Sequence, residues 1–112
     1  MRAANQRKNE SDEKIMARLR KPINELVDKY CSNKTEYQRL RLRQLTWQAV
    51  DVLVRTGNVA HLKREKDIQR IIRNIREVGA SEKFIEESLS LAGSIYEKMQ
   101  IVYPSLLKRY RG

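Results

Sequence analysis

The sequence predicts an all-α protein: a compact bundle of four main helices plus a short C-terminal helix, with a flexible N-terminal arm. Apolar residues recur every three or four positions through most of the chain, which is the period of an amphipathic helix. Two prolines and four glycines are too few for the many turns of a β fold. The 112 residues suffice for a single core. We therefore expect a disordered arm at 1–10, which is polar and aperiodic, and one helical-bundle domain at 11–112.

The first helix of the domain is expected to begin after Ser11. A serine is a favourable N-cap, and the acidic residues Asp12 and Glu13 follow it in the first turn, where the helix dipole favours negative charge. The apolar spacing then continues across Pro22, which favours one helix kinked at the proline over two separate helices.

The second helix, residues 36–56, is the part of the chain around which the others are expected to pack. Thr35 and Gln38 have the spacing of a capping box, and Gly57 is suited to end the helix in a left-handed conformation. Its second half carries two apolar stripes, so it needs packing partners on two sides. The stripes are Leu42, Leu45, Ala49, Val52 and Leu53, and Leu40, Trp47, Val50 and Val54.

The region after Gly57 has a broken pattern, which predicts a short helical turn at 59–62 and then a helix at 67–78 closed by Gly79. A single helix over 59–78 is the alternative. Ser81 is suited to cap the next helix, over 82–102.

The last predicted element is a short helical segment that begins at Tyr103 and Pro104. Its Leu106 and Leu107 are expected to dock on the bundle, leaving the basic residues and Tyr110 that follow them exposed.

The charge indicates a polyanionic partner. Lys and Arg number 24 against 14 acidic residues, a formal net charge of +10. The cations are concentrated within 34–76, and the acidic residues dominate in 77–101. Such segregation favours a basic face over an evenly mixed surface.

Two groups of residues are candidates for binding phosphates. Arg39, Arg43 and Trp47 share one helical face at i, i+4 and i+8, which would present two guanidinium groups and an indole; alternatively, Trp47 belongs to the core and the arginines form its solvated rim. The second group is a basic stripe along 63–76. The candidate nucleic-acid-binding residues are Arg39, Arg41, Arg43, Trp47, Lys63, Lys66, Arg70, Arg73, Arg76 and Tyr110. Tyr37 is a further aromatic residue that could stack a base.

Enzymatic chemistry has little support in the sequence. There is no glycine-rich phosphate loop, and Cys31 and His61 are too few for a zinc site. Asp51 is expected to bridge Arg55 at i+4 rather than to act as a catalyst. We thus expect no catalytic residue, no metal and no cofactor, although a nucleoside triphosphate on the cationic surface stays open.

The expected function is that of a non-catalytic nucleic-acid-binding accessory domain or subunit. It would hold single-stranded DNA or structured RNA within a replication, primase-like, transcription or ribonucleoprotein assembly. The alternative is a helical protein-interaction adaptor that binds an acidic partner or self-associates. No apolar run approaches the ~20 residues of a membrane span, and no signal peptide is evident. We therefore expect an intracellular protein, in the cytoplasm or nucleoid, with no membrane partner.

Overall fold

The computed structural model describes residues 10–57 and 65–111, and these ranges are all-α, as predicted. Residues 1–9 of the expected arm and the predicted turn at 59–62 lie outside them. The described elements are α2 (Asp12–Cys31), α3 (Glu36–Thr56), α4 (Lys66–Val78), α5 (Glu82–Val102) and α6 (Pro104–Arg111).

The predicted caps form at the starts of three helices. The Thr35 hydroxyl accepts from the Gln38 backbone N–H at 3.1 Å, and the Gln38 side chain accepts from the Thr35 N–H at 3.0 Å. The hydroxyls of Ser11 and Ser81 each accept from a backbone N–H three residues later. Because these bonds satisfy N–H groups that have no partner inside the helix, they define where α2, α3 and α5 begin.

Two glycines end α3 and α4 as predicted. Gly57 has φ 66° and Gly79 has φ 96°, the left-handed region that glycine adopts without a steric cost. The alternative of one helix over 59–78 is wrong, because Glu65 is extended and α4 begins at Lys66.

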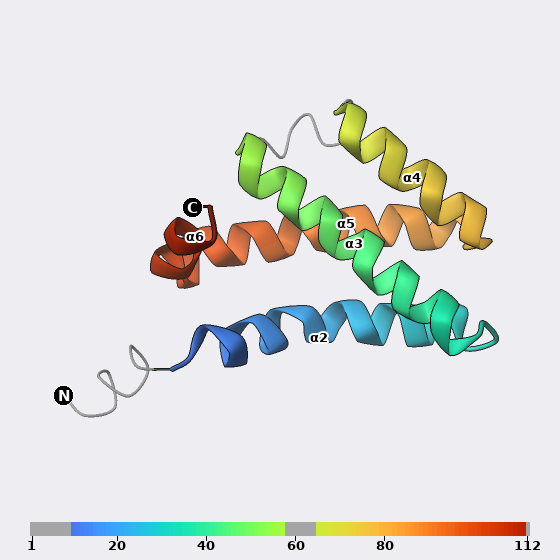
Figure 1. Cartoon of the computed structure of the whole chain (residues 1–112), viewed down its shortest axis with the longest axis horizontal. Coiled ribbons are helices and arrows are strands. Elements are labelled where there is room, and N and C mark those ends of the chain that lie inside the picture. Colours follow the sequence, from blue (N-terminus) through green and yellow to red (C-terminus); the bar gives the residue numbers. More distant parts are fainter. Residues whose placement is uncertain (1–9, 58–64, 112) are drawn as a thin grey trace.

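The helix α3 lies at the centre of the molecule. It contacts α2, α4, α5 and α6, and it crosses in front of α5 in the view of Figure 1, with α2 below and α4 above. Both of its predicted apolar stripes are buried except for Leu40, which is 48% exposed. Both stripes are buried because other helices pack against α3 on more than one side.

The remaining helices complete a single aliphatic core. α2 continues through Pro22 without a break, as the apolar spacing predicts. Phe84 and Tyr96 are the largest fully buried side chains that α5 contributes, and α6 docks through Leu106 and Leu107. No described helix combines the length and the apolarity needed to cross a bilayer.

Candidate nucleic-acid interface

A groove between α2 and α3 brings together residues that lie about twenty positions apart in the sequence. It has a volume of about 670 Å³, and we call it the α2–α3 groove. Its described lining consists of Arg20, Ile23, Asn24, Leu40, Arg43, Gln44, Trp47 and Gln48. Two of these, Arg43 and Trp47, belong to the predicted candidates, and Arg20 comes from the neighbouring helix.

Trp47 forms part of the core and not an exposed stacking surface. The residue is only 8% exposed. Its Nε1–H donates to the Tyr110 hydroxyl at 3.0 Å, and the Arg20 guanidinium lies 4.7 Å from its ring centroid. This placement confirms the alternative in which Trp47 belongs to the core and rules out an exposed indole, and it follows from the packing of α2 and α6 against α3.

Tyr110 is likewise tied to the bundle. Besides accepting from Trp47, its hydroxyl donates to the Asp51 carboxylate. Burial, followed by the bond to Asp51, raises the pKa of Tyr110. Tyr110 is 37% exposed, as expected, but its hydroxyl is engaged by the bundle, which corrects the expectation of a free basic end. The expected bridge from Asp51 to Arg55 is also replaced, since Arg55 pairs with Asp67 at 3.0 Å.

Arg39 and Arg43 have partners within the protein. The Arg39 guanidinium donates to the backbone carbonyl of Lys34 and lies 3.5 Å from the Glu36 carboxylate. Arg43 lies 3.7 Å from Asp28, a distance at which an ion pair is weak, and its buried Nε has no hydrogen-bond partner. Of the two, Arg43 is held less tightly at its guanidinium end, since its contact with Asp28 is longer than a hydrogen bond, whereas Arg39 donates to a backbone carbonyl.

The solvent-facing side of α3 continues the groove. Tyr37, Arg41, Gln44 and Gln48 recur at i, i+4, i+7 and i+11, so they share one face of the helix. Tyr37 is 77% exposed, and Arg41 has no ion pair among the residues the structure describes. This face carries two carboxamides beside one cation, side chains of the kinds that can contact base edges.

Among the described residues of the predicted basic stripe on α4, only some of the cations lack a carboxylate partner. Arg70 lies 2.6 Å from Asp67, and Arg76 donates two hydrogen bonds of 2.8 Å to Glu82. Lys66 and Arg73 are exposed and form no ion pair within the described ranges. Lys63 lies outside the described residues.

The carboxylates that pair with the arginines of α4 and with Arg55 have pKa values below the usual range. The hydrogen bond from Arg55 lowers the pKa of Asp67, and the bond from Arg76 lowers the pKa of Glu82. Both partners of each pair are thus charged at neutral pH, and the pairs reduce the positive field that α4 offers to a phosphate.

Sequence reasoning missed Arg20, Asn24, Gln44 and Gln48 as members of the site. Helical periodicity would have placed the two glutamines on the exposed face of α3. Nothing in the sequence pairs that face with Arg20 and Asn24, because the crossing of α2 and α3 is a tertiary feature. Among the described residues, no three His, Cys, Asp or Glu side chains gather as a metal site would require.

Comparisons with known proteins assign no family to this geometry. No protein-family model matches the chain, and no curated protein or solved structure matches it.

Proposed function

We propose that this protein is a non-catalytic nucleic-acid-binding module that holds single-stranded DNA or RNA along the α2–α3 groove. One observation carries the proposal: the described lining of the groove combines two arginines and three carboxamides, and it includes no carboxylate. A free phosphate chain meets attraction there without a competing negative charge in the lining. The volume of about 670 Å³ lies in the range of ligand sites.

The two kinds of polar side chain suit the two parts of a nucleotide. Arginine donates to phosphate oxygens in a forked geometry, whereas a carboxamide can both donate to and accept from a base edge. Arg20 rests one face on Trp47, so a base could stack on its guanidinium. Tyr37 offers a second stacking surface at the end of the same helix.

A single strand fits this arrangement better than a duplex. Stacking on Tyr37 or Arg20 requires bases that are free of their neighbours, as they are in single strands and loops. The free cations Lys66 and Arg73 on α4 can add contacts to the backbone without reading its sequence. An accessory role in a larger nucleic-acid assembly is the biological setting we propose.

The proposal is tested by fluorescence anisotropy of a labelled oligonucleotide at about 50 and about 200 mM salt. The logarithm of the affinity should fall with the logarithm of the salt concentration, by about 0.7 per phosphate contact. Arg20→Gln should weaken binding about ten-fold, because it removes a charged donor from the groove. Lys21→Gln is the matched control, since Lys21 is exposed one position away and outside the groove lining.

Three results would overturn the proposal. The first is absence of binding at low salt. The second is an equal loss for Arg20→Gln and Lys21→Gln, which would indicate attraction to the net charge alone. A loss confined to the double variant Lys66→Gln, Arg73→Gln would move the site to α4.

A further inference from the structure

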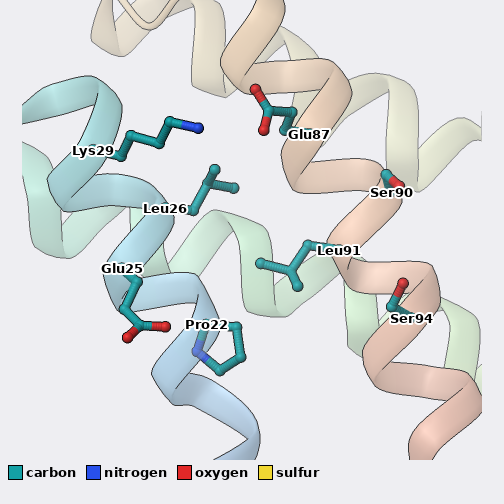
Figure 2. Close-up of a pocket in the computed structure, with 8 residues that line it drawn as sticks. All are labelled: Pro22, Glu25, Leu26, Lys29, Glu87, Ser90, Leu91 and Ser94. Atoms are coloured by element: carbon teal, nitrogen blue, oxygen red, sulfur yellow. The ribbon is translucent and has the colours of Figure 1, made fainter.

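A second groove lies between α2 and α5, and its chemistry differs from that of the first. Its volume is about 400 Å³, and we call it the α2–α5 groove. Its described lining consists of Pro22, Glu25, Leu26, Lys29, Glu87, Ser90, Leu91 and Ser94. Figure 2 shows Leu26 and Leu91 pointing toward one another from the two helices, with Glu25 near Pro22 and with Lys29 and Glu87 at the other end.

The charged side chains of this groove leave a negative excess. Glu87 accepts a hydrogen bond from the Tyr30 hydroxyl, and the Lys29 ammonium lies 5.2 Å from the Tyr30 ring centroid. Tyr30 thus engages both rim charges, Lys29 through its ring and Glu87 through its hydroxyl. Glu25 is exposed and has no hydrogen bond or ion pair within the described part of the chain.

The backbone beside Pro22 adds another acceptor. Proline has no N–H, so the carbonyl of Arg18, four residues earlier, lacks its usual helical donor. Residues 18, 22 and 25 share one face of α2, and Pro22 and Glu25 of this face line the groove. The Glu25 carboxylate is the acceptor that an occupant with hydrogen-bond donors and a positive charge would meet there.

The two grooves flank α2 with opposite charge. Arg20 and Asn24 line the α2–α3 groove, and Pro22, Leu26 and Lys29 line the α2–α5 groove on the other flank of the same helix. The first lining carries two cations and no carboxylate, whereas the second carries two carboxylates and one cation. A phosphate chain is attracted to the first and repelled by the second.

We propose that the α2–α5 groove is a docking site for a cationic amphipathic segment of a partner protein. An aliphatic side chain of the partner would enter between Leu26 and Leu91, and a lysine or arginine beside it would pair with Glu25. This is recognition of an amphipathic peptide in an apolar groove with a charged rim. Docking in this groove does not depend on the proposed function; an adaptor role between nucleic acid and a basic protein would rest on both proposals.

The experiment uses the full chain with labelled leucine methyl groups and a synthetic peptide of leucine and lysine at helical spacing. The peptide should shift the Leu26 and Leu91 methyl resonances saturably. A version with glutamate in place of each lysine should not. The protein carries a net charge of +10, so general attraction cannot draw a cationic peptide to it, and a saturable shift identifies a local site.

A pair of charge reversals makes the test specific. Glu25→Lys should weaken peptide binding roughly five-fold or more, because it turns an attraction at the rim into a repulsion. Glu97→Lys should change it less than about two-fold. It makes the same change at an exposed position of α5 outside the groove lining.

Three outcomes would overturn the proposal. One is the absence of methyl shifts with the lysine peptide, and another is an equal loss for both charge reversals. The third is a shift of the same methyl groups by protein concentration alone or by an oligonucleotide, which would identify a second copy or nucleic acid as the occupant. The first two outcomes leave the proposed function untouched, because that function is tested separately by the effect of Arg20→Gln on oligonucleotide binding.

Discussion

Among single residues, Trp47 has the most varied surroundings. The Arg20 guanidinium covers one face of its ring, and the Tyr110 ring meets it edge to face at 6.5 Å between centroids. The Tyr110 hydroxyl accepts from the indole and donates to Asp51, so one side chain of α6 satisfies two polar groups of α3. An aromatic residue that lies among arginines, as Trp47 does, is therefore not necessarily available to bind a ligand.

The two hydrogen bonds of the Tyr110 hydroxyl predict how its removal changes the stability of the protein. Tyr110→Phe should lower the free energy of unfolding by about 1–2 kcal/mol, because it leaves the indole N–H without its acceptor and Asp51 without a donor. Urea unfolding followed by circular dichroism measures the change. Tyr37→Phe is the control, since Tyr37 is 77% exposed, and it should change stability by less than about 0.5 kcal/mol. Equal effects would show that the Tyr110 hydroxyl is unimportant.

The candidate site could be predicted only partly at this scale. Helical spacing correctly placed Arg43 and Trp47 near one another, but it could not tell which side chain would be exposed. That depends on Arg20 and Tyr110, which approach from other helices. The ion pair of Arg43 with Asp28 could not be predicted for the same reason, because Asp28 lies on another helix.

At the scale of elements, the helix ends show a close agreement between sequence and structure. The N-caps and the glycine ends act within a few residues, so their chemistry is readable without the tertiary fold. Gly79 closes α4 at φ 96°, and a Cβ there would lie 2.8 Å from the flexible Lys34 Nζ. The backbone conformation is the stronger constraint, because the lysine end can move.

Gly79→Ala should therefore destabilise the protein by about 1–2 kcal/mol, the cost of a left-handed conformation for a residue with a Cβ. Gly79→Asn should cost less, because asparagine tolerates this region better than alanine. Thermal unfolding of the two variants beside the parent protein measures the order. Alanine equal to or better than asparagine would contradict the conformational explanation.

Ion pairs connect the helices to one another. Arg109 of α6 donates two hydrogen bonds to Asp12 of α2, at 3.0 and 2.6 Å. Arg55 of α3 pairs with Asp67 of α4 at 3.0 Å. The hydrogen bond from each arginine lowers the pKa of its carboxylate. Both pairs are on the surface, so each stabilises the contact between helices only modestly.

These lowered pKa values give stability a defined pH dependence. The contribution of Asp12 is present above its unfolded pKa of about 4 and is lost as the pH falls through the lower folded value. Asp12→Asn should reduce stability at neutral pH and make its decline below pH 4 shallower. Urea midpoints between about pH 2 and pH 7 test this.

For the whole molecule, the position of α3 determines cooperativity. Because α3 contacts every other described helix, no helix pair has a core of its own that excludes it. Leu53 and Val50 are fully buried on α3. The described helices extend over 49 × 29 × 20 Å, so the molecule is elongated, and yet its core is one connected cluster.

Unfolding should accordingly be a single transition. Circular dichroism, which reports all helices, and the fluorescence of the single Trp47 should give the same urea midpoint. Leu53→Ala should lower both midpoints together and cost about 2–5 kcal/mol through the cavity it creates. An earlier fluorescence transition would contradict this, since it would mean that the helices around Trp47 separate from α4 and α5.

The sequence by itself determined the helical class, the caps and the buried stripes, because these depend on the 3.6-residue period and on contacts within one turn. Only the tertiary structure decided which cations remain free, since the carboxylates that engage Arg43 and Arg55 come from other helices. The two grooves are likewise a product of packing. Each is formed where α2 meets a different helix, and no local rule fixes how two helices cross.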